Sequence, residues 1–289
     1  MKRNYFRALA PLLFCAGFSA CDDAGEPVPS TPEEMYVRAQ ELIKPNIEGE
    51  KSDFAGAMQW LTRSAEAGLL QAQLDLGGIY LTGGKDIPAE PVKAYDWFAR
   101  AAAQGSTEAE FYLGHILYNG LGRAADRAAA VAHWRKAAEG GIGEAQYRLA
   151  HLLLQDVATK DEGLALLEKA AASSALKLAA QAACDMGYIC AKGQHGVAVD
   201  MHKAAEWYAR SARGGNSRAQ LVYGLMLLSG DPVPANPQQG MSMIRLAAGQ
   251  DNPQAIAMLI NLLRNAENAA ENEEEAAAWS ERLESLRRK

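Results

Sequence analysis

The feature that most constrains the fold of this chain is a pattern that returns every 36 or 37 residues along most of its 289 residues. Six segments share an alanine at their second position, and most have a small residue five places later, as in QAQLDLGGIY and EAEFYLGHIL. The six alanines are Ala72, Ala109, Ala145, Ala182, Ala219 and Ala255. Because self-similarity at a period of roughly 20 to 50 residues is typical of stacked repeats, we expect a repeat protein.

A second pattern lies between these segments and stays in phase with them. It consists of a basic residue followed two places later by alanine, as in Arg100 with Ala102 and Arg210 with Ala212. Loops rich in glycine and proline, such as TGGKDIPAEP and SGDPVPANP, separate the two patterns. Each repeat is therefore predicted to be two helices. In four repeats the second helix is expected to pack a tryptophan near its centre: Trp60, Trp97, Trp134 and Trp207.

Together the two patterns predict an all-α fold, an α-solenoid of about seven helix-turn-helix repeats. A single helical hairpin cannot bury its apolar face alone, so the hairpins must stack. The expected repeats cover residues 31–68, 69–105, 106–141, 142–175, 176–215, 216–250 and 251–289. The last of these is rich in charged residues, which suits a terminal repeat whose outer face meets water.

Single residues predict several helix boundaries. Thr31 and Glu34 form a capping-box pattern, Pro91 suits a first helical position, and Asp200 suits an N-cap. Cys184 and Cys190 lie six residues apart in one predicted helix, or about 9 Å along its axis. Since a disulfide rarely joins Cα atoms more than about 7 Å apart, we expect two free, buried or half-buried thiols.

The first 20 residues have the organisation of a bacterial secretion signal. Three basic residues precede an apolar stretch at residues 8–18, which is too short for a transmembrane helix of about 20 residues. The sequence FSAC at its end resembles a lipobox, so Cys21 is the predicted lipidated N-terminus of the mature chain. Residues 21–30 are then an acidic, proline-containing tether. The alternative is an ordinary secretory signal, in which Cys21 has no special role.

The predicted lipid anchor indicates the localisation of the protein, and the charge of the chain indicates its class of partner. We expect a lipid-anchored protein of the bacterial cell envelope that faces the periplasm. Asp22, directly after the lipidated cysteine, favours the inner membrane. The net charge of −6 and the scarcity of clustered basic residues argue against a nucleic-acid partner.

The segment from Tyr188 to Gly215 resembles the Sel-one-like repeat, a longer relative of the tetratricopeptide repeat. In that family a G-x-G-V-x-x-D-x-x-K-A-x-x-W-Y run joins two helices, and here the spacing of the two glycines is one residue wider. The matching residues are Gly193, Gly196, Val197, Asp200, Lys203, Ala204, Trp207, Tyr208 and Ala212. The resemblance implies a right-handed superhelix that holds other proteins in a concave groove. The family includes envelope scaffolds and immunity proteins that neutralise secreted toxins.

By analogy with tetratricopeptide repeats, positions three, six and nine residues after the repeat alanine face the groove. The candidate protein-binding residues are Asp75, Tyr112, His115, Tyr118, Arg148, His151, Asp185 and Tyr188. Aromatic, arginine and histidine side chains are suited to a binding hot spot. Two alternatives stay open: these side chains pack or are solvated without a partner, or the two histidines and Asp185 hold a metal ion. His195 and His202 are interpreted as solvated surface residues.

The sequence contains none of the common catalytic signatures, and we expect no catalytic residue, metal or cofactor. Ser174 and Lys177 form a lone S-x-x-K match, whose usual partner motifs are missing. The expected function is a tethered scaffold that binds a protein or peptide. One alternative is an immunity protein that neutralises a secreted, phospholipase-type toxin, and a weaker one is a cell-wall or β-lactam hydrolase.

Overall fold

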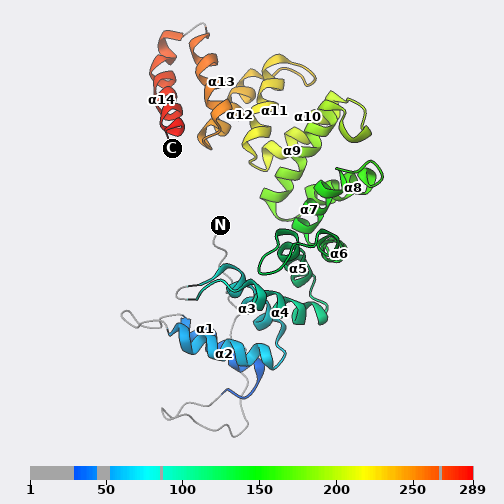
Figure 1. Ribbon diagram of the computed structural model, residues 1–289. Coiled ribbons are helices and arrows are strands. Elements are labelled where there is room, and N and C mark those ends of the chain that lie inside the picture. The colour runs from blue at the N-terminus through cyan, green and yellow to red at the C-terminus, as the bar shows by residue number, and fades with distance from the viewer. Residues whose placement is uncertain (1–28, 44–52, 85–86, 267–268, 289) are drawn as a thin grey trace. The chain divides into compact units, whose positions relative to one another are not determined.

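The computed structural model describes residues 29–43, 53–84, 87–266 and 269–288. In this part of the chain there are fourteen α-helices, which are labelled in Figure 1. Contacts divide the chain into two units, Met1–Ile142 and Gly143–Lys289. The predicted signal peptide, Cys21 and nearly all of the predicted tether lie outside the described residues.

Each unit is a row of antiparallel helical hairpins, in which the first helix is called helix A and the second helix B. The first unit contains α1 (Pro32–Ile43), α2 (Phe54–Glu66), α3 (Leu70–Thr82), α4 (Pro91–Ala103), α5 (Thr107–Asn119) and α6 (Arg127–Glu139). Its hairpins are α1 with α2, α3 with α4, and α5 with α6.

The second unit continues the same alternation with four hairpins. It contains α7 (Gly143–Leu153), α8 (Lys160–Ala171), α9 (Leu176–Lys192), α10 (Met201–Arg213), α11 (Ser217–Ser229), α12 (Pro237–Gly249), α13 (Pro253–Arg264) and α14 (Ala269–Arg287). A short 3₁₀ turn, Gln194–Gly196, follows α9. The predicted all-α solenoid of helical hairpins is thus what the chain forms, while the handedness of a superhelix stays a prediction.

Within several hairpins a large side chain of helix B lies against a glycine of helix A. A Cβ atom on Gly77 would lie 2.7 Å from the ring of Phe98, and one on Gly187 would lie 3.0 Å from the ring of Tyr208. A Cβ atom on Gly114 would be closer still to Trp134. The small residue that recurs five places after the repeat alanine is therefore the site where helix B approaches helix A most closely.

Not all four tryptophans are packed in the core, in contrast to the expectation from the repeat pattern. Trp134 is fully buried, but Trp60, Trp97 and Trp207 are only half-buried. The residue after each half-buried tryptophan occupies the core instead: Leu61, Phe98 and Tyr208. The three tryptophans are covered by the arginine three residues later, whose guanidinium carbon lies 4.6 to 5.5 Å from the ring centre.

The predicted helix boundaries are confirmed. The Thr31 hydroxyl accepts from the Glu34 N–H at 3.2 Å, and the Glu34 carboxylate accepts from the Thr31 N–H at 3.1 Å. The backbone N–H of Ser30 is the main cause that lowers the pKa of Glu34. Pro91 begins α4, and the Asp200 carboxylate caps α10 by accepting from the Lys203 N–H at 2.9 Å.

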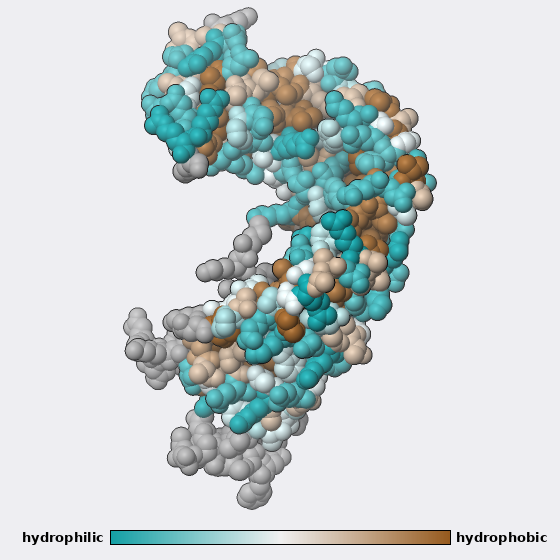
Figure 2. All heavy atoms as spheres, in the orientation of Figure 1, coloured by the Kyte–Doolittle hydropathy of each residue, from teal (hydrophilic) through white to brown (hydrophobic). Residues whose placement is uncertain are grey.

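The two cysteines and the last helix also match expectation. Cys184 and Cys190 are free and buried in α9, and burial raises the pKa of the Cys184 thiol to about 11. Only Ala276 of α14 is buried, and hydrophilic side chains gather over this helix (Figure 2). Among the described residues no helix is both long enough and apolar enough to cross a bilayer.

Candidate functional site

The predicted groove residues of the first unit fall into two groups, and one group is not accessible. Asp75 is 2% exposed and Tyr112 is 9% exposed, so neither can contribute to a surface that a partner touches. Tyr112 stacks on Phe98 with ring centres 4.7 Å apart. The prediction that these two side chains face an open groove is therefore wrong, because each is taken up by packing against a neighbouring helix.

Asp75 is the centre of a tie between two A helices. Its carboxylate accepts from the Tyr36 hydroxyl of α1 at 2.7 Å and from the Gln71 side-chain amide of α3 at 2.9 Å. Burial raises the pKa of Asp75 to about 6, and the two hydrogen bonds only partly oppose that effect. Burial and the neighbouring carboxylate together raise the pKa of Tyr36.

The second unit contains the same tie at the equivalent place. The Tyr147 hydroxyl of α7 donates to Asp185 of α9 at 2.8 Å, and Gln181 donates to the other carboxylate oxygen at 3.2 Å. Burial, followed by the hydrogen bond to Asp185, raises the pKa of Tyr147. Asp185 differs from Asp75 in one respect, since its side chain keeps 18% of its surface exposed.

Three further predicted residues, His115, Tyr118 and Arg148, are exposed or half-buried. His115 and Tyr118 are half-buried on α5, where His115 contacts the Asn119 amide and Tyr118 lies 5.1 Å from Trp134, ring to ring. Arg148 of α7 pairs with Glu144 one turn earlier at 2.9 Å, with both side chains about 40% exposed. None of these three contacts requires a binding partner, so these residues gain no support as a binding site.

Three predicted residues do come together, in a pocket between α7 and α9. His151, Asp185 and Tyr188 line a cavity of about 310 Å³ whose apolar lining includes Leu154 and Ile189. The His151 imidazole reaches Asp185 at 3.3 Å through Nε2 and meets the Tyr147 ring edge to face at 4.5 Å. The remaining lining residues are Gln155, Gln194 and His195. This volume is at the small end of the range for ligand sites, about 300 to 1,000 Å³.

Sequence reasoning missed three polar residues that line this pocket, Gln155, Gln194 and His195, and it interpreted His195 as a solvated surface residue. Of the three, His195 has an unusual backbone conformation. Its φ of +55° lies in the left-handed region, which non-glycine residues seldom adopt. Such a conformation costs of order 1 kcal/mol or more and is concentrated at functional sites. The sequence feature that could have indicated His195 is the wider spacing of Gly193 and Gly196. The additional residue between these glycines places a histidine in the pocket lining.

The described residues of the pocket do not have the geometry of a metal site. In the described ranges no group of three or more histidine, cysteine, aspartate or glutamate side chains has the geometry to hold an ion. Asp185 already accepts hydrogen bonds from Tyr147, Gln181 and His151. The chemistry that remains is hydrogen bonding from amide and imidazole groups beside an apolar floor.

The repeats match a known family model. The model for the Sel1 repeat matches residues 47–69, 70–106, 107–142, 143–174, 180–216 and 217–252, which together are well over half of the chain. The chain belongs to the Sel1 repeat family. Two of the matched repeats, 143–174 and 180–216, contain the helices that line the pocket.

Solved structures of Sel1 repeat proteins share this fold. One is c5321, a protective antigen of uropathogenic Escherichia coli strains, with 25% identity and a TM-score of 0.73 over 88% of this chain and 54% of that chain. A Sel1 repeat protein from Oxalobacter formigenes has 20% identity and a TM-score of 0.70 over 89% of this chain and 100% of that one. The second likeness shows the fold alone.

A curated relative matches over a shorter length. Chitin synthase regulatory factor 3 of Schizosaccharomyces pombe is 37% identical over 91 residues, which are 31% of this chain and 10% of that protein. This chain also spans about half of the c5321 protein. The family-model match places the chain among Sel1 repeat scaffolds, a class of solenoid suited to protein binding.

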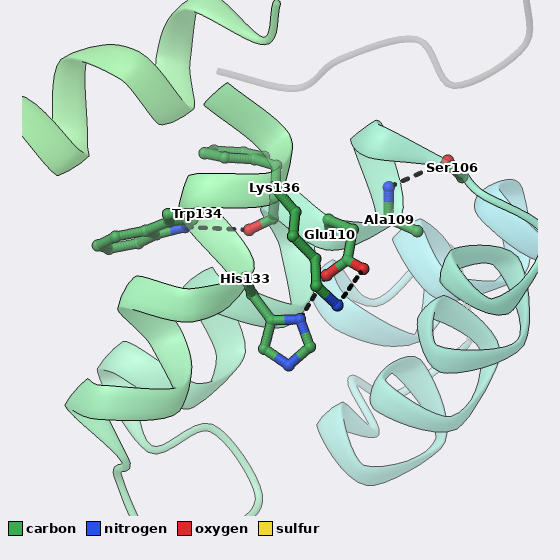
Figure 3. A network of polar contacts seen from close by, with 7 residues as sticks. Ser106, Ala109, Glu110, His133, Trp134 and Lys136 are labelled. Atoms are coloured by element: carbon green, nitrogen blue, oxygen red, sulfur yellow. Dashed lines mark hydrogen bonds and ion pairs between the residues drawn. The ribbon is translucent and has the colours of Figure 1, made fainter. Parts of the chain in front are cut away.

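The third Sel1 repeat contains a polar cluster of a different kind, drawn in Figure 3. Glu110 of α5 is 9% exposed, and both His133 and Lys136 of α6 point toward its carboxylate. His133 Nδ1 lies 2.5 Å from one carboxylate oxygen, and Lys136 Nζ lies 3.1 Å from the other. His133 and Lys136 stand where Trp97 and Arg100 stand one repeat earlier. The cluster joins the two helices of one hairpin, and we assign it a structural role.

Proposed function

We propose that the protein is a non-catalytic, membrane-tethered scaffold of the bacterial cell envelope, and that the pocket between α7 and α9 anchors a protein or peptide partner. The observation that supports this most is the pocket itself. It gathers His151, Tyr188 and His195 around an apolar floor, and one of them is held in a strained backbone conformation. Tyrosine is one of the residue types that supply much of the energy of protein interfaces.

The proposal of a membrane tether is based on the sequence alone. Cys21 follows a lipobox-like sequence, and acylation of its mature N-terminus would hold the chain at a membrane. Expression of the full chain and of Cys21→Ala, followed by membrane fractionation and mass spectrometry of the N-terminus, tests this. We expect the intact chain in the membrane fraction with a diacylated or triacylated cysteine, and the variant in the soluble periplasmic fraction. An unmodified, soluble wild-type chain would contradict the tether.

Partner binding is tested by cross-linking and affinity capture from the envelope of the native organism. The bait is the mature chain, compared with the double variant His151→Ala and Tyr188→Ala. His202→Ala is the matched control, because His202 is an exposed histidine of the same unit that does not line this pocket. We expect one stoichiometric partner that the control retains and the double variant loses. Capture that the folded double variant retains in full would remove the pocket from the function.

The identity of the captured protein separates the two classes of partner. A resident envelope protein would fit a scaffold or adaptor. A secreted effector whose toxicity this chain suppresses would fit the immunity function that the family resemblance implies. The hydrolase alternative gains no support, since Ser174 and Lys177 are both exposed and an activated serine–lysine pair works in a shielded site.

A further inference from the structure

We infer that the pocket between α7 and α9 recognises the C-terminal carboxylate of its partner polypeptide, together with the apolar side chain of the last residue. This inference rests on the proposed function, because it assumes a peptide partner, and it names the part of that partner which is held. The elements that carry it are the Gly193–Gly196 loop, the side chains beside it and the apolar floor.

The loop that closes the pocket has the backbone geometry of an anion-binding turn. Gly193 and His195 are left-handed, with φ of +66° and +55°, while Gln194 between them is helical. Alternation of right- and left-handed residues turns successive N–H groups toward one concavity, which suits carboxylates. Among the described residues, the N–H groups of Gln194 and His195 have no hydrogen-bond acceptor. These two amide groups are therefore available to a ligand.

The equivalent loop after α5, called the sibling loop below, does not leave this backbone N–H group without an acceptor. After α5, Gly120 and Gly122 stand only two residues apart, and the Leu121 N–H between them donates to Ile116 at 3.0 Å. Leu121 occupies the position of Gln194, directly after the left-handed glycine that ends helix A. The additional residue in the later loop thus coincides with a released amide and with a histidine in the pocket lining.

The side chains around the loop match both halves of a C-terminal residue. Gln155, Gln194 and His195 bring hydrogen-bond donors, while Leu154 and Ile189 are 7% and 4% exposed and form an apolar floor. A C-terminal residue offers a carboxylate and an apolar side chain on the same Cα atom. Aspartate and glutamate side chains offer a carboxylate without that second group. A cavity of about 310 Å³ fits one such residue.

The pocket already contains one carboxylate, that of Asp185, and neighbouring side chains donate hydrogen bonds to it. Asp185 accepts from Tyr147, Gln181 and His151, so it offers little to a cationic ligand. The ammonium group of Lys160 lies beside Gly196 and adds positive charge at the loop. The local charges therefore favour an anionic group over a lysine or arginine of the partner.

The test is a titration of the purified chain with short acetylated peptides, followed through the amide NMR signals of Gln194 and His195. The probes have the sequence acetyl-Gly-Ser-Ala-X, where X is Leu, Ile, Val, Met or Phe. Each is used with a free C-terminus and as the C-terminal amide, and acetyl-Gly-Ser-Ala-Asp amide presents a side-chain carboxylate. We expect the free acids to bind at least about tenfold more tightly than their amides, a difference of about 1.4 kcal/mol.

Two variants connect the binding to the loop. Deletion of His195 restores the glycine spacing of the sibling loop and should reduce affinity for the free acids at least about tenfold. His195→Gly keeps the backbone and removes the imidazole, so a smaller loss of about threefold is expected. His202→Ala is the control and should bind like wild type. Circular dichroism and the melting temperature verify that each variant is folded.

Each outcome decides for or against the inference. Equal binding of acid and amide, or full binding by the folded deletion variant, would overturn recognition of the carboxylate by this loop. Binding of the aspartate amide as tight as that of the free acids would overturn the preference for a chain terminus. If none of the peptides shifts the two amides at about 2 mM, the inference fails. The capture experiment is independent of these titrations, so the proposed function can survive that failure.

Discussion

At the scale of single residues, the most informative side chain is a carboxylate that the fold buries. Asp75 is 2% exposed and ties α1 to α3 through Tyr36, while its counterpart Asp185 in the second unit stays partly open and lines a pocket. The same residue type at the same repeat position is thus structural in one place and part of a candidate site in the other. What differs is the depth of burial, which repeat position alone does not encode.

The raised pKa of Asp75 predicts a specific dependence of stability on pH. Because its folded-state pKa of about 6 lies above the usual value of 3.8, the folded state binds the proton more tightly than the unfolded state. The contribution to stability is present below pH 4 and is lost as pH rises through 6, with an upper limit of about 3 kcal/mol. Asp75→Asn cannot titrate. The unfolding free energy of wild type minus that of Asp75→Asn should therefore fall between pH 4 and pH 7.

Urea unfolding followed by circular dichroism at several pH values measures this difference. The exposed Asp96 of the same unit is the matched control, and the difference between wild type and Asp96→Asn should stay constant over the same range. A flat profile for Asp75→Asn would mean that the buried carboxylate is stabilised by its two hydrogen bonds as fully as water would stabilise it.

At the scale of helices, the close approach of helix B to a glycine of helix A predicts a graded series. The space for a Cβ atom decreases from Gly187 against Tyr208, through Gly77 against Phe98, to Gly114 against Trp134. Substitution by alanine should therefore destabilise least at Gly187 and most at Gly114, within the range of about 1 to 3 kcal/mol for overpacking. Thermal and urea unfolding of the three variants measure the order.

A compensating change tests the cause of that effect. If the clash with the indole is responsible, Trp134→Leu should recover part of the stability lost in Gly114→Ala, and the double-mutant cycle should show coupling of about 1 kcal/mol or more. Additive effects would show that the loss comes from the helix backbone instead. That result would also remove the explanation for the small residue that recurs in the repeats.

At the scale of the whole molecule, much of the fold was predictable because it depends on periodic, local properties. The repeat period, the alternation of helices, the cap at Asp200 and the free cysteines all follow from residue spacing and helix geometry. The inaccessible members of the groove, Asp75 and Tyr112, were not predictable from spacing, since burial depends on the neighbouring helix. The pocket is predictable in part: repeat spacing identifies His151, Asp185 and Tyr188, but it does not identify His195, because the additional residue in its loop changes the path of the backbone.

The packing of the last hairpin leads to a prediction about removal of α14. Ile256, Leu259 and Leu263 of α13 are at most 2% exposed, in a cluster to which Ala276, Trp279 and Leu283 of α14 contribute. Truncation after Asn265 uncovers this cluster, so the chain should lose solubility, and exchange of α12 and α13 amides should accelerate. Size-exclusion chromatography and hydrogen exchange measure both effects. Glu281→Ala, which changes an exposed side chain of α14, is the control and should behave like wild type.

The two kinds of contact described above also bear on how such a chain can lengthen by gene duplication. The aromatic–glycine contact lies inside one hairpin, as between Gly114 and Trp134, so a duplicated hairpin carries both partners with it. The tyrosine–aspartate tie joins successive hairpins. A duplicated hairpin inserted between the hairpins of α1 and α3, or between those of α7 and α9, would separate the tyrosine from the aspartate. New repeats are therefore tolerated best at junctions without such a tie. The tied junctions, one of which forms the pocket, are the places where the order of hairpins is fixed.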